Sequence, residues 1–208
     1  MVKNTSIPAQ ESHKKNIGVI LLAAGASSRL GHPKQLLPYA NQSLLEHSLQ
    51  EAVASGAAPI ILVLGAKADS IETQIEKGDA CIVVNTKWQE GMASSIRFGV
   101  DTLLTVTPDP DGAVLMVCDQ PYVSSALLEQ LMETYQQTGK RIVASGYDNA
   151  AGPPVFFHRT LFPELLQLTG DVGAKKLLNK YPGEVEIVLF PEGNIDIDTE
   201  ADYRNLEK

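Results

Sequence analysis

The sequence predicts an α/β fold in which a mostly parallel, twisted sheet carries helices on both faces. Short apolar runs alternate with segments whose apolar residues recur at helical spacing. The runs are almost wholly apolar, which is typical of parallel strands that are buried on both faces. Small or polar residues stop the first four runs, as expected where a strand ends and a loop begins. Together these features indicate three layers in a Rossmann-like arrangement with right-handed crossovers.

Seven apolar segments are expected to be strands. The first five alternate with helical segments along the chain. The alternation relaxes after the fifth strand, where a loop that contains Gly152 and two prolines leads into a short sixth strand. The expected strands are residues 17–22, 59–64, 80–84, 113–118, 141–145, 155–157 and 184–190.

The segments between the strands are expected to be helices because their aliphatic residues fall on one face. The first has the sequence of a capping box, since Ser43 precedes it and Glu46 follows three residues later. The fifth has Pro163 in its first turn, where proline is tolerated. The expected helices are residues 43–54, 69–76, 91–104, 124–137, 161–168, 174–181 and 199–206.

Length and composition limit the domain organisation and the partners. The chain has 208 residues, and we expect a single domain at residues 16–208. Residues 1–15 lack an apolar segment, so we expect a flexible tail rather than a signal peptide or an anchor. A net charge of −8 without a basic block argues against nucleic acid or a membrane as the main partner. Cys81 and Cys118 lie in apolar runs, as expected for reduced thiols of a cytoplasmic protein.

The loop after the first strand is a candidate binding site for a polyphosphate. Ala23, Ala24 and Gly25 stop the strand, and small and polar residues then bring in Arg29 and Lys34. Backbone amides at the carboxyl end of a strand, combined with two cations, suit phosphate groups. The glycine spacing is neither that of a Walker A loop nor that of the dinucleotide-binding fingerprint. A tight turn with two solvated surface charges fits the same residues, and the pattern by itself leaves both interpretations open.

Two aspartates at the ends of apolar or alternating segments are candidates for a metal site. Asp119 directly follows the fourth strand, and Asp198 ends a segment that alternates between polar and apolar residues. Mg²⁺ takes one or two carboxylates together with phosphate oxygens and water. Such a site would stabilise negative charge while pyrophosphate is displaced from a nucleotide. Two alternatives remain, namely Asp119 as the start of a turn and Asp198 or Thr199 as the N-cap of the last helix.

Four motifs resemble those of the MobA-like nucleotidyltransferases, in particular the molybdenum cofactor cytidylyltransferase branch. The stretch from Leu22 to Lys34 matches the signature Leu-Ala-Ala-Gly-x-Ser-x-Arg-x-Gly…Lys. The segment that begins at Asn85 is similar to Asn-x-x-Trp-x-x-Gly-Met-x-x-Ser, and Asp119 lies in a Cys-Asp-Gln-Pro motif. GPPV at Gly152, followed by LFPEL and GDVGA, is similar to the substrate-side half of that branch. The resemblance implies a nucleotide-diphospho-sugar transferase-like fold over most of the chain.

The same resemblance implies a role for each candidate residue. Arg29 and Lys34 would be catalytic residues on the phosphates, while Asp119 and Asp198 would hold Mg²⁺. Pro153 stands where many relatives have Asn or His, which concerns the choice of acceptor. The residues implied in binding nucleotide or acceptor are Ala23, Ala24, Gly25, Gly65, Asn85, Ser94, Ser95, Gly152 and Pro153.

The implied reaction joins CTP to the terminal phosphate of molybdopterin-bound molybdenum cofactor and releases pyrophosphate. CTP is favoured over GTP because the guanylyl-transferring branch usually has Gly-Gly where this chain has residues 26–28, Ala-Ser-Ser. One alternative is nucleotidyl transfer to another phosphorylated or sugar-phosphate acceptor. The other is a non-catalytic protein that binds and delivers molybdenum cofactor. The implied partners are the two small-molecule substrates and a molybdoenzyme or its delivery chaperone.

Overall fold

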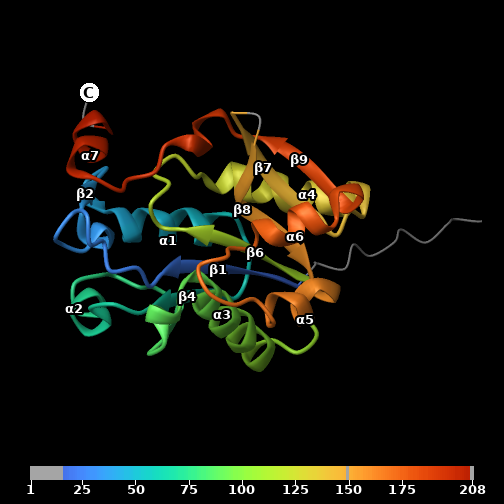
Figure 1. The fold of residues 1–208 in the computed structure, drawn as a ribbon, viewed down its shortest axis with the longest axis horizontal. Coiled ribbons are helices and arrows are strands. Elements are labelled where there is room, and N and C mark those ends of the chain that lie inside the picture. Colours follow the sequence, from blue (N-terminus) through green and yellow to red (C-terminus); the bar gives the residue numbers. More distant parts are fainter. Residues whose placement is uncertain (1–15, 149, 207–208) are drawn as a thin grey trace, which may run out of the picture.

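The structure is a computed structural model that describes residues 16–148 and 150–206. The flexible tail expected at residues 1–15 lies outside this range. A single seven-stranded sheet runs through the described part of the chain, in the strand order β5-β4-β1-β6-β8-β7-β9 (Figure 1). The large strands are β1 (Ile17–Ala23), β4 (Ile60–Leu64), β5 (Cys81–Val84), β6 (Gly112–Val117), β7 (Ile142–Tyr147), β8 (Ala150–His158) and β9 (Val185–Leu189).

The sheet is mostly parallel, as predicted. The four strands β5, β4, β1 and β6 lie next to one another and are parallel, and β7 is parallel to β9. Only β8 runs the other way among the strands of this described sheet, pairing antiparallel with β6 and β7. A second, two-stranded sheet is formed by β2 (Pro38–Tyr39) and β3 (Gln42–Ser43).

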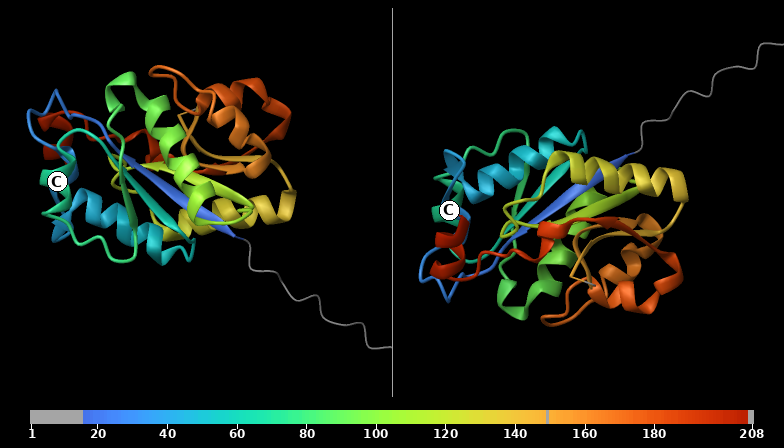
Figure 2. Two further views of the ribbon diagram at one scale, coloured as in Figure 1. Left: turned by 90° about the horizontal axis from the view of Figure 1, so that it is seen from below. Right: turned by 90° about the horizontal axis from the view of Figure 1, so that it is seen from above.

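Helices cover both faces of the large sheet. Figure 2 shows α3 across one face in the left view and α1 with α4 across the other in the right view. The packing agrees, because α1, α2 and α4 contribute to one apolar cluster and α3, α5 and α6 to the other. The helices are α1 (Leu44–Ala54), α2 (Ala68–Glu72), α3 (Met92–Val106), α4 (Ser125–Thr138), α5 (Phe162–Leu165), α6 (Lys175–Lys180) and α7 (Glu200–Leu206).

Two local features concern the start of one helix and the packing of another. Ser43 and Glu46 make the predicted capping box, in which each side chain accepts a hydrogen bond from the other's backbone amide. Gly99 lies inside α3 although glycine disfavours helices. A Cβ at Gly99 would collide with the side chain of Ile20, so the missing side chain lets α3 pack closely against β1.

The loop expected before the sixth strand is instead part of β8. Ser145 of β7 pairs with Gly152, whereas its neighbour Ala144 pairs with Val155. Pro153 and Pro154 therefore lie in an irregularity of the ladder, where the N–H groups that proline lacks are not required. The prolines suggested a loop because proline is rare inside strands, but this irregularity accommodates both.

Smaller differences affect helix lengths and the cysteines. α2 ends at Glu72, four residues before the expected end, and α5 covers only Phe162–Leu165 of the expected 161–168. Both cysteines are free thiols, and Cys118 is buried whereas Cys81 is partly exposed. Within the described ranges, no helix has the length and apolar character needed to cross a bilayer.

Candidate active site

The carboxyl ends of four neighbouring strands meet at one edge of the sheet. Ala23 at the end of β1 lies beside Leu64 of β4, which in turn lies beside Val84 of β5. On the other side of β1, Leu22 lies beside Val117 of β6. The residues that follow these strand ends therefore lie along one edge of the sheet. In open α/β sheets this edge is where ligands bind.

The loop after β1 is held by hydrogen bonds from the side chain of Gln35, which the sequence did not single out. Gln35 is buried, and its Nε2 donates hydrogen bonds to the carbonyl oxygens of Ala23 at 2.8 Å and Gly25 at 3.1 Å. Ser27 Oγ accepts a hydrogen bond from the backbone N–H of Lys34 at 3.1 Å. These bonds fix both ends of the loop. A buried glutamine next to Lys34 has no sequence signature of its own, so only the fold reveals it.

Gly65 supports the loop from the neighbouring strand. A Cβ at Gly65 would lie 2.7 Å from the carbonyl oxygen of Ala24 and 2.7 Å from the Cβ of Trp88, so only glycine fits without displacing the backbone. The next residue, Ala66, donates its N–H to the same Ala24 carbonyl at 3.0 Å. Gly65 thus lies against the loop and allows β4 to pack beside it.

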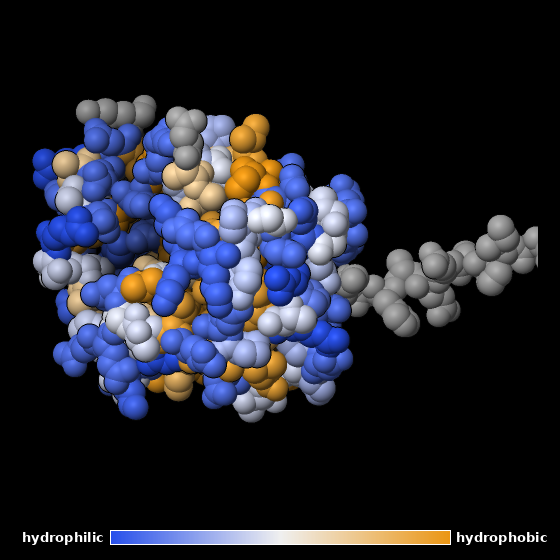
Figure 3. Space-filling model, turned by 45° about the vertical axis from the view of Figure 1, so that its right-hand side comes forward, coloured by the Kyte–Doolittle hydropathy of each residue, from blue (hydrophilic) through white to orange (hydrophobic). Residues whose placement is uncertain are grey.

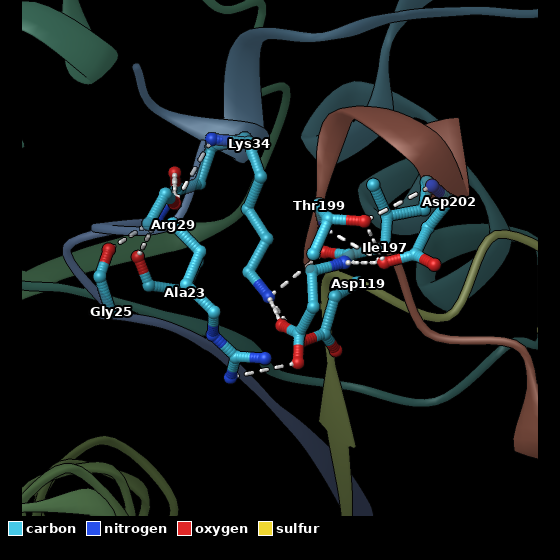
Figure 4. A network of polar contacts seen from close by, with 11 residues as sticks. Ala23, Gly25, Arg29, Lys34, Asp119, Ile197, Thr199 and Asp202 are labelled. Atoms are coloured by element: carbon cyan, nitrogen blue, oxygen red, sulfur yellow. Dashed lines mark hydrogen bonds and ion pairs between the residues drawn. The ribbon is translucent and has the colours of Figure 1, made fainter. Parts of the chain in front are cut away.

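Lys34 joins the two predicted metal ligands. Its Nζ donates hydrogen bonds to Asp119 Oδ2 at 2.7 Å, to Asp198 Oδ1 at 2.9 Å and to the carbonyl oxygen of Ile197 at 3.1 Å (Figure 4). The Lys34 side chain is only 12% exposed. Arg29 forms an ion pair of 3.1 Å with the other oxygen of Asp198. Residues separated by more than 160 positions in the sequence are therefore brought to one cluster of two cations and two carboxylates.

Thr199, and not Asp198, caps the last helix. Thr199 Oγ1 accepts a hydrogen bond from the backbone N–H of Asp202, and the Asp202 carboxylate accepts one from the N–H of Thr199. This reciprocal pair begins α7. The Asp198 carboxylate is not part of the pair and contacts Lys34 and Arg29 instead.

The ionisation of the cluster follows from these contacts. Burial alone would lower the pKa of the Lys34 amine, but the charge of Asp119 and the hydrogen bonds to both aspartates raise that pKa well above its ordinary value. The hydrogen bond from Lys34 in turn lowers the pKa of Asp198. At neutral pH the cluster therefore holds a charged Lys34 ammonium beside the ionised carboxylate of Asp198.

The two aspartates fit a divalent metal, to judge by the cation that they already contact. Asp119 and Asp198 arrive from different elements, yet both accept hydrogen bonds from one ammonium group. Among the described residues, no group of three or more His, Cys, Asp or Glu side chains is arranged to hold a metal. Mg²⁺ needs only one or two carboxylates when phosphate oxygens and water complete its shell, so a two-carboxylate site suits a nucleotide-bound ion.

One cavity opens beside this cluster, and a second cavity lies next to the first. The loop-side cavity, of about 330 Å³, is lined by the loop residues Gly25 and Ala26 together with Lys34 and Asp119. A hollow with a mostly hydrophilic border is visible at the left of Figure 3. The β8-side cavity, of about 200 Å³, is lined almost entirely by apolar groups and includes Gly152 and Pro153. The two cavities are adjacent, because both are lined by Leu22, Met92 and Val117.

Asn85, Ser94 and Ser95 form a buried network at the start of α3. Asn85 Nδ2 donates to Ser94 Oγ at 2.8 Å and to Ser95 Oγ at 3.0 Å, and Asn85 Oδ1 accepts from the N–H of Lys87. Ser95 lines the loop-side cavity, whereas Asn85 and Ser94 line a separate cavity on the outer side of this turn. Of these three predicted binding residues, only Ser95 therefore lines the loop-side cavity.

The segment around Gly170 and Asp171, between α5 and α6, packs against the start of α3. Ala93 N–H donates to the carbonyl oxygen of Gly170 at 3.1 Å, and a Cβ at Gly91 would lie 2.5 Å from Asp171 Oδ1. Asp171 lines the loop-side cavity, while Gly173 and its neighbours line the β8-side cavity. One short segment thus borders both cavities.

Comparison with known proteins places this chain in a family. Residues 19–185 match the family model described as the MobA-like NTP transferase domain. A protein named nicotine blue oxidoreductase, from Paenarthrobacter nicotinovorans, is 30% identical over 199 residues, covering 90% of this chain and 95% of that protein. The purine catabolism protein PucB of Bacillus subtilis is 28% identical over 88% of this chain and 92% of its own length.

Solved structures give the same result. The crystal structure of Rv0371c from Mycobacterium tuberculosis has a TM-score of 0.80 and 35% identity, covering 92% of this chain and 97% of that one. A structure of Rv0371c in complex with manganese matches with a TM-score of 0.77 and 33% identity, covering 92% of this chain and 98% of the other. A relative of this chain therefore binds a divalent metal ion.

Proposed function

The chain belongs to the MobA-like NTP transferase domain family and is a nucleotidyltransferase, and on that premise we propose that it is a Mg²⁺-dependent cytidylyltransferase. Its proposed substrates are CTP and molybdopterin-bound molybdenum cofactor. The observation that carries the proposal is the convergence of Lys34, Asp119 and Asp198 on the cavity side of the loop that follows β1. Nucleotidyl transfer from a triphosphate requires cationic groups and metal ligands held in fixed positions around the phosphates.

In the proposed reaction, a terminal phosphate oxygen of the acceptor attacks the α-phosphorus of CTP. A new phosphorus–oxygen bond forms, the bond from the α-phosphorus to the bridging oxygen breaks, and pyrophosphate leaves. No protein nucleophile is needed, because positioning and charge stabilisation suffice for this chemistry. The amides of Ala23, Ala24 and Gly25 would orient the triphosphate, and Arg29 and Lys34 would carry its negative charge.

Asp119 and Asp198 would hold Mg²⁺, which supplies positive charge to the phosphate oxygens when bound. Gly65, Asn85, Ser94 and Ser95 would shape the walls around the nucleoside. The β8-side cavity, with Gly152 and Pro153, would receive the acceptor, since its apolar lining suits a flat heterocycle better than a phosphate chain. The cytoplasm is the proposed location, and a molybdoenzyme or its delivery chaperone is the proposed protein partner.

The test is pyrophosphate release by purified protein supplied with CTP, Mg²⁺ and molybdenum cofactor. We expect release that depends on all three components and is lower with GTP in place of CTP. Release with a different phosphorylated acceptor, but not with molybdenum cofactor, would assign the alternative acceptor. Binding of molybdenum cofactor without turnover of any nucleotide would favour a delivery protein.

A reaction of another class is named for one relative, the Paenarthrobacter oxidoreductase. The same preparation, assayed with reduced nicotinamide and flavin nucleotides, tests whether this chain also catalyses electron transfer. The cluster of Lys34, Arg29 and two aspartates favours phosphate chemistry, because four charged groups suit a polyphosphate and a metal.

A further inference from the structure

The position that a metal would take between Asp119 and Asp198 is the position of the Lys34 ammonium. Both carboxylates contact that ammonium, at 2.7 and 2.9 Å, and Arg29 neutralises the second oxygen of Asp198. Each of the two carboxylates thus has a cationic partner, and the charge of Asp196 also acts on Lys34 and on both aspartates. A divalent ion that arrived alone would meet an ammonium and a guanidinium instead of a free carboxylate pair.

We infer that Lys34 is the resident cation of this site: it holds Asp119 and Asp198 together before the substrate enters, and it gives them up when a metal–nucleotide complex arrives. This inference rests on the proposed function, because it assumes that the incoming substrate carries phosphates. Lys34 thereby becomes a positioning residue for the metal ligands, in addition to its proposed contact with phosphate.

Charge explains why the metal should wait for the nucleotide. Adding a divalent cation to the cluster costs the ion pairs of Lys34 and brings like charges within a few ångströms in a partly buried setting. A nucleoside triphosphate supplies negative charge that Lys34 and Arg29 can bind instead. The two aspartates are then free for the metal, so each ligand raises the affinity for the other by the same factor.

The anchoring of Lys34 makes the exchange feasible. Its backbone N–H is held by Ser27 Oγ at 3.1 Å, and the short helical turn Lys34–Leu36 follows it, so the base of the side chain is fixed. The four-carbon stem is flexible and ends in a point charge. The loop-side cavity is lined by both Lys34 and Asp119, so the ammonium could turn from the carboxylates toward phosphates within one space.

The experiment measures Mn²⁺ binding to the protein with and without CTP, and with no acceptor present. The readout is the electron paramagnetic resonance signal of free Mn²⁺, corrected with protein-free samples for the Mn²⁺ that CTP binds by itself. In the natural protein we expect weak Mn²⁺ binding alone and at least tenfold tighter binding with CTP. Lys34→Met keeps the apolar stem but removes the charge. It should bind Mn²⁺ alone at least tenfold more tightly than the natural protein does, and CTP should add little. Lys34→Arg should retain weak binding of Mn²⁺ alone.

Lys77→Met is the matched control, because Lys77 is exposed and lies between α2 and β5, away from the aspartates. It should leave both Mn²⁺ affinities unchanged. The inference is overturned if folded Lys34→Met binds Mn²⁺ no more tightly than the natural protein. It is equally overturned if the natural protein binds Mn²⁺ as tightly without CTP as with it, a result that needs no variant.

The outcomes for this inference and for the proposed function can be told apart. If the natural protein releases pyrophosphate as proposed but Lys34→Met binds Mn²⁺ with unchanged affinity, the proposed reaction stands and the inference about Lys34 is wrong. If Lys34→Met binds Mn²⁺ more tightly but the natural protein turns over no nucleotide, the inference about Lys34 stands and the proposed reaction is wrong.

Discussion

The two cavities share Leu22, Met92 and Val117 but are built by different forces. The loop-side cavity has three charged side chains among its otherwise largely apolar lining, namely Lys34, Asp119 and Asp171, and Lys34 is hydrogen-bonded to Asp119 across 85 positions of the sequence. The β8-side cavity is bordered mainly by apolar side chains and includes Gly152, where a Cβ would collide with the hydroxyl of Tyr147. The first can select a ligand by charge and the second by shape, which matches a division between a nucleotide and its acceptor.

The largest expected effect comes from Asp119→Ala, which removes charge from the loop-side cavity alone. We expect at least a 100-fold loss of kcat, because a carboxylate for the metal is lost. CTP binding should weaken chiefly in its Mg²⁺-dependent part, as measured by calorimetry with and without Mg²⁺. Glu133→Ala, at an exposed acid on α4, is the control. Normal turnover by Asp119→Ala would show that the metal assignment is wrong.

Gly152→Ala tests the opposite cavity through shape alone. A Cβ at Gly152 would collide with the hydroxyl of Tyr147, so the variant is expected to lose between about 1 and 3 kcal/mol of stability. The KM for the acceptor should rise while the affinity for CTP is kept. Adding Tyr147→Phe removes the colliding hydroxyl and should recover part of both losses in a double-mutant cycle.

If Gly152→Ala weakened CTP binding as strongly as acceptor binding, the division between the two cavities would be incorrect. Strictly additive losses in the cycle would show that the hydroxyl of Tyr147 is not the obstacle.

Gln35→Met tests whether the loop is held by its hydrogen bonds. The change keeps the side-chain length but leaves the buried carbonyl of Ala23 without its donor, at a cost of about 1.5 kcal/mol in thermal unfolding. CTP affinity should fall as the loop loosens, while acceptor affinity is unchanged. Gln50→Met, at an exposed position of α1, is the control. An unchanged melting temperature would mean that Gln35 is not what fixes the loop.

The smallest effect is expected from the capping box, which belongs to the scaffold and to neither cavity. Ser43→Ala should cost about 1 kcal/mol of stability. The hydrogen bond from Ser43 lowers the pKa of Glu46, so the stabilisation by ionised Glu46 is complete at neutral pH. It is lost as the pH falls through the lowered pKa, below about 4.3. Chemical unfolding from pH 7 to pH 3 should show this acid-dependent part in the natural protein and less of it in Ser43→Ala.

Local patterns were enough to predict most strands of the large sheet. The apolar runs fixed the strands, and the rule that parallel strands end together brought Ala23, Gly65, Asn85 and Asp119 to one edge. The capping box at Ser43 was also readable, because its two partners lie three residues apart. Interactions between residues that are close in the sequence can therefore be predicted from local patterns.

Long-range packing was not readable in the same way. Gln35 and the irregularity at Pro153 depend on neighbours that only the folded chain supplies. The hairpin of β2 and β3 was missed because its turn, Ala40-Asn41, lacks glycine although both residues have positive φ, at 49° and 67°. The contact of Lys34 with both aspartates could not be deduced either, because no pattern gives the distance between Asp119 and Asp198.

The route of the chain after β9 has a consequence for synthesis. From the edge strand the chain crosses back over the molecule toward the end of β1, as Figure 1 shows, and the N–H of Ile197 bonds to the carbonyl of Asp119 at 2.9 Å. Asp198 therefore reaches the cluster only after every strand of the sheet has been made. A ribosome that stops shortly after β9 would release a chain with all seven strands of the sheet and half of its carboxylate pair.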